Sequence, residues 1–355
     1  MNSPAKRRLR TLVGGAIPVV LTGALLSIDH IPGTDIALTV PYAAEGPGPT
    51  VDTLGEVDGT QVVDVHAPHT YATTGQLNMT TVSVRTRMTM AQALGRWLLT
   101  DDTIVPIDTV IPQGQTDEQI NELNQQAFTQ SESAATVAAM DYLDIPVKIV
   151  VAQVLENSAA AGAIEAEDVI TAIDGEEVSE PGQVQERIQG KKPGDAITLS
   201  VLRKGKPLHK EIVLGENPHA KGQALLGVSM TSEPKEDISV EYNLQDVGGP
   251  SAGMMFTLAV IDKLTEENLT GGAFVAGTGT IEEDGEVGPI GGIMHKVQAA
   301  KDAGAELFLA PADNCAEAVR RDTGDMVVAK VSTLEDAIEA MDAFAAGGEV
   351  ETCKP

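Results

Sequence analysis

The sequence predicts a mixed α+β protein of two or three domains. Its 355 residues are enough for that number of domains at about 150 residues each. Apolar and polar residues alternate, as is typical of strands, at 60–66, 80–87, 196–202 and 207–214. Helix-like patterns lie among them, at 88–99, 117–140, 183–188 and after Ser251. We therefore expect sheets and helices in every part of the chain.

The chain is strongly acidic, with 24 Lys and Arg against 52 Asp and Glu and a net charge of −28. Such a surface repels phosphate backbones, so no nucleic-acid partner is expected, and the charge is interpreted as a solubilising coat. No cofactor or metal site is expected, because His66 and His69 have no carboxylate or thiol pattern to complete one. Cys315 and Cys353 allow at most one disulfide.

The amino terminus predicts a membrane anchor. A basic tail, 1–10, carries four cations, and the next eighteen residues, 11–28, carry no charge. We expect a single transmembrane helix over 11–29 with the tail in the cytoplasm and the bulk of the chain outside it. A cleaved signal peptide is the alternative. We favour a retained anchor because no A-x-A site precedes Asp29.

Residues 31–140 are expected to form an N-terminal extracytoplasmic region of unknown role. The Gly- and Pro-rich part, 31–60, predicts a stalk or the rim of a small domain. The stretch 117–140 is dominated by Gln, Asn, Glu and Ala and predicts a surface helix. No chemistry is assigned to either.

The segment 141–216 predicts a small domain of its own. It combines strands at 147–155 and 169–175, an Asp174-Gly175 turn and a short helix at 183–188. This order, with the phrase SAAAGAIEAEDVITAIDGEEV, resembles a PDZ domain of the kind attached to bacterial exported proteases.

The PDZ resemblance implies that a peptide adds as a strand to an open sheet edge, with its terminal carboxylate on loop amides. The family's Gly-Leu-Gly-Phe-like loop would fall at 142–145, so the candidate peptide-binding residues are Leu143, Asp144 and Ile145. Asp144 replaces the usual glycine and places an anion beside a carboxylate. Binding of internal peptides and a structural role therefore both stay open.

The strongest motif begins at 246 with DVGGPSAGMMFTLAVIDKL. Gly248, Gly249 and Pro250 predict a turn, after which Ser251 opens an apolar helix. A serine at that position has nearby backbone amides that can hold an oxyanion. Taken alone, a helix cap is the commoner explanation.

A second motif, AGTGTIEEDGEVGPIGGIMHK at 276–296, favours a catalytic role for Ser251 over a helix cap. Together with GPSAG it resembles the proteolytic domain of Lon proteases, whose α/β fold is like domain 2 of ribosomal protein S5. The resemblance covers 220–346, followed by an acidic tail, 347–355. With the PDZ-like segment before it, the chain resembles the membrane-anchored PDZ–Lon proteins of Gram-positive bacteria.

The Lon resemblance implies a serine endopeptidase with Ser251 as nucleophile and Lys296 as general base. A lysine can act as a base only as a neutral amine, which needs a desolvating pocket that lowers its pKa. Thr278 is expected beside the lysine as an orienting hydroxyl. The backbone amides around Gly249, Pro250 and Ser251 are expected to form the oxyanion hole.

The same resemblance implies protein or peptide substrates, a lipid bilayer around the anchor and a homo-oligomeric ring of subunits. The chain contains no G-x-x-x-x-G-K-[ST] phosphate loop, so we expect proteolysis without ATP. Two alternatives stay open. One is a catalytically latent, PDZ-based scaffold. The other is a small-molecule kinase that uses VGGPSAG as a phosphate cradle. A disulfide between Cys315 and Cys353 would pin the acidic tail to the domain.

Overall fold

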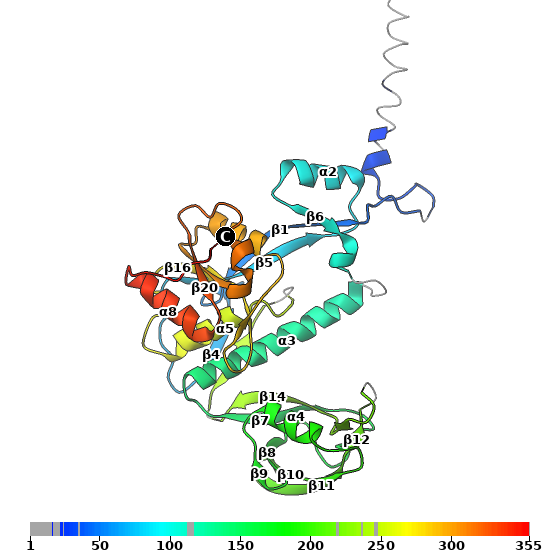
Figure 1. The fold of residues 1–355 in the computed structure, drawn as a ribbon, viewed down its shortest axis with the longest axis vertical. Coiled ribbons are helices and arrows are strands. Elements are labelled where there is room, and N and C mark those ends of the chain that lie inside the picture. Colours follow the sequence, from blue (N-terminus) through cyan, green and yellow to red (C-terminus); the bar gives the residue numbers. More distant parts are fainter. Residues whose placement is uncertain are drawn as a thin grey trace, which may run out of the picture.

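The computed structural model describes residues 16, 22–23, 25–34, 36–111, 117–217, 220–235, 237–244 and 248–354. The expected basic tail and most of the expected anchor, 11–29, lie outside these residues. Within the described part of the chain, no helix is both long and apolar enough to cross a bilayer. The described residues form a mixed α+β structure with two large sheets, as the sequence predicts for the fold class (Figure 1).

The first sheet takes its strands from both ends of the chain. Its order is β20-β19-β16-β5-β1-β6. The bounds are Tyr42–Asp52 (β1), Gln76–Arg85 (β5), Thr103–Pro106 (β6), Phe274–Gly277 (β16), Leu307–Pro311 (β19) and Val327–Val331 (β20). β16 runs parallel to β5 and β19, whereas β1 is antiparallel to β5 and β6. The expected separate region 31–140 therefore shares a sheet with the Lon-like segment.

Strand β1 replaces the stalk that the sequence predicts at 31–60. Its GPGPT run lies inside the strand, and the register against β5 shifts between Pro47 and Thr50. Proline has no N–H to give to a ladder, so the two prolines occupy an irregular stretch of the strand. Gly48 permits a close approach, since a Cβ there would lie 2.8 Å from the carbonyl of Thr81. These residues mark a bulged inner strand and not a loop.

Helices cover both faces of the first sheet. They are α2 (Met90–Leu99), α3 (Asp117–Tyr142), α5 (Gly253–Leu264), α6 (Ile293–Ala303), α7 (Cys315–Ala318) and α8 (Leu334–Ala345). Leu307 and Leu309 of β19 belong to the core that includes α5 and α8, whereas Phe308 and Ala310 belong to the one that includes α6 and α7. This alternation follows from the two-residue period of a strand.

Helix α3 is a core helix, although its composition predicts a surface helix. Ala135 and Ala139 are fully buried, and the helix packs along α5. Phe128 meets Phe256 of α5 edge-on, with ring centroids 5.7 Å apart. Every residue of the second half, 131–140, is buried or half-buried, whereas 121–126 is exposed. The small and apolar residues of the second half thus decide where the helix lies, while the polar residues of the first half meet solvent.

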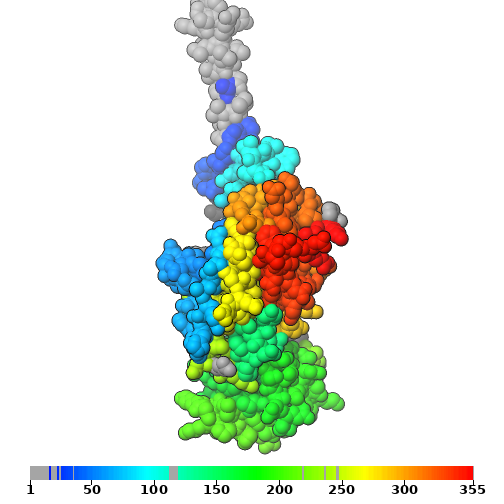
Figure 2. Space-filling model, turned by 90° about the vertical axis from the view of Figure 1, so that its left-hand side faces the viewer, coloured from blue at the N-terminus to red at the C-terminus, as the bar shows by residue number. Residues whose placement is uncertain are grey.

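The second sheet forms the PDZ-like domain, which gathers at one end of the molecule (green in Figure 2). Its order is β11-β10-β8-β7-β14, with β9 beside β8. The elements are β7 (Val147–Val154), β8 (Val169–Ile173), β9 (Glu176–Glu177), α4 (Pro181–Gln189), β10 (Ala196–Arg203), β11 (Lys206–Val213) and β14 (Val228–Pro234). Because β14 pairs with β7 along its length, this domain reaches residue 234 and passes the expected boundary at 216.

Short strand pairs complete the fold. The longest of them joins β4 (Val63–His66) to β15 (Ser239–Tyr242), so the chain that leaves the PDZ-like domain returns to the first domain. The others are β2 (Glu56–Val57) with β3 (Thr60–Gln61), β12 (Gly215–Glu216) with β13 (Ala224–Leu225), and β17 (Thr280–Ile281) with β18 (Val287–Gly288). The PDZ-like domain is thus inserted within the first domain.

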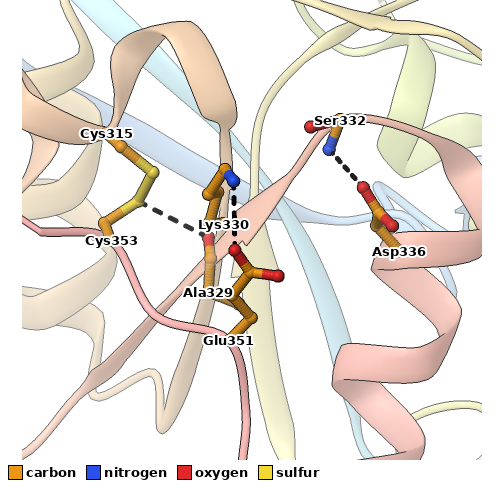
Figure 3. Close-up of a disulfide and its surroundings, with 7 residues drawn as sticks. All are labelled: Cys315, Ala329, Lys330, Ser332, Asp336, Glu351 and Cys353. Atoms are coloured by element: carbon orange, nitrogen blue, oxygen red, sulfur yellow. Dashed lines mark hydrogen bonds and ion pairs between the residues drawn. A yellow bond between two sulfur atoms is a disulfide. The ribbon is translucent and has the colours of Figure 1, made fainter.

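A disulfide joins Cys315 at the start of α7 to Cys353 near the carboxyl end (Figure 3). The two Cα atoms are 4.9 Å apart, and the sequence separation of the two cysteines is 38. Beside the disulfide, the Lys330 backbone N–H donates to the Glu351 carbonyl at 2.9 Å, and the two side chains pair at 3.0 Å. The acidic tail is thereby fixed along β20.

We expect loss of this disulfide to destabilise the protein by about 2–4 kcal/mol, because the unfolded chain regains the freedom of the closed loop. Thermal unfolding of the wild type with and without reductant, beside the Cys315→Ser/Cys353→Ser double variant, measures this. Reductant should lower the melting temperature of the wild type only. An equal effect on both proteins would contradict the expectation.

Candidate active site

Ser251 lies in the turn just before α5. The helix begins at Gly253, and its N-cap, Ala252, makes no side-chain capping bond. Gly249 has a φ of 87°, a left-handed conformation that glycine adopts at little cost. α5 is buried from Gly253 to Lys263, so the turn is attached to a fixed element. The Ser251 hydroxyl therefore does not cap the helix and is available for another contact.

That contact is with Lys296. The Lys296 Nζ donates to Ser251 Oγ at 2.7 Å and to Thr278 Oγ1 at 2.9 Å. The Thr278 hydroxyl in turn donates to the Ser251 carbonyl oxygen at 2.9 Å. The structure thus brings together all three residues that the sequence singles out as catalytic. They come from the turn before α5, the segment after β16 and the first turns of α6.

The lysine is held in a dry environment. Its exposed fraction is 3%, and that of Thr278 is 0%. Burial lowers the pKa of Lys296 from 10.5 to about 8, because desolvation disfavours the charged amine. At neutral pH roughly a tenth of the lysine side chains are then neutral. Ile293, one turn away on the same helix, is fully buried as the expected pocket requires.

Helix α3 holds the turn that carries Ser251. The Gly249 amide donates to the Asn124 carbonyl at 2.9 Å, and the Ser131 hydroxyl donates to the Pro250 carbonyl at 3.0 Å. Sequence reasoning assigned no role to this helix. The signal that could have revealed it is the line of small residues on one face, which permits a close approach to another helix.

The last glycine of GPSAG is required by packing. A Cβ on Gly253 would lie 2.7 Å from both the Ser131 Oγ and the Ile281 side chain. Such distances are closer than carbon atoms approach in folded proteins. Gly253 therefore lets α3 and β17 meet at the start of α5.

The expected oxyanion hole is only partly available. The Gly249 amide is occupied by Asn124, and Pro250 has no N–H. Of the three residues predicted for this role, Ser251 alone keeps an amide that can be directed at an oxyanion. The prediction fails for Gly249 and Pro250 because the turn is fastened to α3 by its backbone.

The predicted peptide-binding loop is also occupied. The amides of Leu143, Asp144 and Ile145 donate to carbonyl groups in the last turn of α3, at 3.1, 3.0 and 2.8 Å. Asp144 has a φ of 54°, as residues that end a helix often do. These amides cap the helix and cannot also hold a carboxylate. The three residues connect α3 to the PDZ-like domain.

An apolar groove of about 250 Å³ lies instead between α4 and β14. Val184, Ile188, Leu226, Gly227, Val228 and Met230 contribute to its lining. Among the described residues, β14 is the terminal strand of its sheet and pairs with β7 alone, although α3 also packs against it. This is the arrangement that β-strand addition requires.

The loop that enters β14 has the pattern expected of a carboxylate loop. Leu225-Leu226-Gly227-Val228 is closer to Gly-Leu-Gly-Phe than 142–145 is. The carbonyls of Leu226 and Gly227 accept from the amides of Ala160 and Leu155, at 3.0 and 2.9 Å. Across trans peptide bonds, the amides of Gly227 and Val228 point the other way. The sequence prediction placed the carboxylate loop before the first strand of the domain, whereas this loop comes just before the last strand, β14.

His295 and the acidic loop at 282–286 add no ligand set. His295 is buried, with an exposed fraction of 2%. The side chain that bonds to Ser251 is that of the next residue, Lys296.

A larger cavity, about 790 Å³, lies between α3, α4 and the acidic loop. There, burial and neighbouring carboxylates raise the pKa of Glu283. Within the described ranges, no group of three or more His, Cys, Asp or Glu is placed to hold a metal.

Two family matches agree with this geometry. Residues 113–214 match the PDZ domain family, and residues 239–341 match the C-terminal proteolytic domain of Lon (S16) proteases. The chain therefore carries a PDZ domain and a Lon-type serine protease domain, which confirms the two domain types predicted from the sequence.

Curated relatives point the same way. A Lon protease of Phenylobacterium zucineum is 32% identical over 155 residues, 42% of this chain and 19% of that protein. The peroxisomal Lon protease homolog 2 of Caenorhabditis elegans is 30% identical over 44% of this chain and 20% of its own length. The periplasmic pH-dependent serine endoprotease DegQ of Escherichia coli is 32% identical over 34% of this chain and 29% of that protein.

The chain spans about a fifth of the length of these two Lon relatives. Among solved structures, the PDZ domain of an SdrC-like protein of Listeria innocua is 27% identical. It covers 23% of this chain and 92% of that one, with a TM-score of 0.22.

We expect the rate of peptide cleavage to rise with pH and to level off above an apparent pKa of about 8. If Lys296 is the base, its protonated form has no lone pair to accept the Ser251 proton, so activity should be lost as pH falls below that value. The measurement is kcat/KM on a peptide substrate across this range, with circular dichroism at each pH as the control for folding. A flat profile would contradict the role of the lysine.

Ser131→Ala should lower kcat by about three- to tenfold, because a loosened turn misplaces the Ser251 hydroxyl. Thr136→Val is the matched control. Thr136 lies on the same helix, α3, and its hydroxyl bonds to that of Tyr242 on β15. The substitution removes this bond and leaves the turn that carries Ser251 untouched. Comparable losses in both variants would mean that only general stability of α3 matters.

Proposed function

We propose that this protein is a membrane-anchored, extracytoplasmic serine endopeptidase that works without ATP through a Ser251–Lys296 dyad. The observation that carries this proposal is the contact of 2.7 Å between a serine hydroxyl and a buried lysine amine. The lysine is desolvated, and its pKa of about 8 is near that of a general base at neutral pH.

Catalysis begins when the neutral Lys296 amine accepts the proton of the Ser251 hydroxyl. The oxygen then attacks the peptide carbonyl and forms a tetrahedral intermediate, to whose oxyanion the Ser251 amide donates. The Lys296 ammonium returns its proton to the leaving amine. A water molecule hydrolyses the acyl-enzyme with the same amine as base.

Thr278 positions the two partners. Its hydroxyl proton is directed to the Ser251 carbonyl, so its oxygen can only accept from the lysine. The lysine amine is thereby held beside the serine hydroxyl. Substrates are already unfolded or exposed segments of proteins, because the chain has no phosphate loop with which to drive unfolding.

Two observations support the location outside the cytoplasm. The first is the sequence of the amino terminus, a basic tail followed by eighteen uncharged residues. The second is the disulfide between Cys315 and Cys353, because such bonds persist in oxidising compartments and are rare in the cytosol.

The PDZ domain supplies substrate binding. A peptide adds to the outer edge of β14 and places its side chains in the apolar groove against α4. Its terminal carboxylate lies on the amides of Gly227 and Val228. Leu143, Asp144 and Ile145 have no part in this contact.

The test of catalysis uses the full chain without ATP and an unfolded protein such as casein. Wild type should cleave it, and Ser251→Ala and Lys296→Ala should each lower the rate by at least about a thousandfold. Cleavage that survives in the Ser251 variant would overturn the assignment. If all three folded proteins are inert and a serine-directed probe fails to label the wild type, the PDZ-based scaffold becomes the better explanation.

The test of the groove is Met230→Asp, which places a charge in an apolar site. We expect KM for casein to rise about fivefold or more with kcat nearly unchanged, since only binding is weakened. Val213→Asp, at an exposed position on the opposite edge strand β11, is the control. A change in kcat alone would argue against substrate binding in this groove.

A further inference from the structure

Helix α2 exposes its apolar face. Met90, Leu94, Trp97 and Leu98 recur at positions i, i+4, i+7 and i+8, the spacing that normally faces a core. Here their exposed fractions are 43%, 42%, 62% and 65%. The helix instead packs inward through Ala93, with Met88 just before it. A contiguous exposed apolar patch of this kind marks a surface that something else covers.

The charge around α2 also departs from the rest of the chain. Residues 85–100 contain three arginines and no acid, in a protein with a net charge of −28, and Asp101 and Asp102 follow directly. Arg85 and Arg87 are exposed, and Arg96 pairs with Asp102 at 2.5 Å. Cationic and apolar side chains together suit an anionic lipid surface. Trp97 is the only tryptophan of the chain, and tryptophan favours the level of the lipid headgroups.

The position of α2 relative to the amino terminus completes the pattern. Leu38 donates its amide to the Asp29 carbonyl at 2.7 Å, and Thr39 forms a bridge with Thr89, the N-cap of α2. Through these backbone contacts, the end of the uncharged segment 11–28 lies close in space to the start of α2. Figures 1 and 2 both show α2 beside the start of the described chain, at the end opposite the PDZ domain. Leu25, Leu26, Ile31 and Ile36 extend the exposed apolar surface there.

We propose that α2 lies on the outer face of the membrane with Met90, Leu94, Trp97 and Leu98 among the acyl chains near the headgroups. This inference rests on the anchoring that is part of the proposed function. With the anchor it makes a second point of attachment. Two attachments fix the orientation of the molecule relative to the membrane, whereas a single attachment would let it rotate. The PDZ groove then faces away from the bilayer.

The single tryptophan allows a direct test on the full chain in vesicles of phosphatidylcholine and phosphatidylglycerol. Trp97 fluorescence should shift to the blue, lose most of its intensity with bromine-labelled acyl chains and be protected from acrylamide. Leu94→Glu/Leu98→Glu should abolish the quenching by brominated lipid while the protein still floats with the vesicles. Val213→Glu, an exposed apolar position in the PDZ domain, is the matched control and should behave as wild type.

The outcomes separate this inference from the proposal that it rests on. Flotation with vesicles and no quenching by brominated lipid would overturn the role of α2 and leave the anchor intact. A blue shift without lipid quenching would likewise overturn it and assign the helix face to a second copy of the chain. A protein that does not float would overturn both the anchor and the surface contact. Casein cleavage tests catalysis independently of all three.

Discussion

Removal of the Lys296 amine from water is the constraint around which the protease domain is built. A buried ammonium is costly, so the amine needs hydroxyl partners in fixed positions and an apolar wall that excludes solvent. Ser251 and Thr278 are the partners, and both are attached to buried backbone. The buried helix α5, and the glycine that lets α3 and β17 approach it, also help to exclude water from this site. The lowered pKa of Lys296 thus depends on the packing of the whole domain.

Helix α3 connects the two domains physically. On one side Ser131 holds the turn that carries Ser251. Two residues further on, the Ser133 hydroxyl bonds to that of Thr231 on β14 at 2.7 Å. β14 also borders the groove against α4. A single helix therefore contacts both the strand that would receive a peptide and the turn that would cut one.

Short motifs that require a particular turn or helix could be predicted from the sequence. Contacts between segments far apart in the sequence could not. GPSAG predicts a turn followed by a helix, and the structure has α5 there, because turn and helix signals are local. Asp174-Gly175 forms its hairpin with φ values of 53° and 83°, as that dipeptide predicts. The GPGPT strand and the polar helix α3 are misjudged because their places depend on partners far away in the sequence. The peptide groove is misplaced for the same reason, since its loop precedes β14, the last strand of the domain, which pairs with β7 about 80 residues earlier in the sequence.

The insertion of the PDZ domain also sets the order in which the chain can fold. β5 and β16 are neighbours in the sheet, yet Gln76 pairs with Phe274, about 200 residues further on. During synthesis from the amino terminus, β1 and β5 can pair long before β16 has been made. Until then, the edge of β5 that later pairs with β16 has no partner strand. The PDZ domain, which is continuous in sequence, can fold during that wait. Newly made protein thus passes through a stage with a finished binding domain and a half-built protease, which delays any cleavage until synthesis is nearly complete.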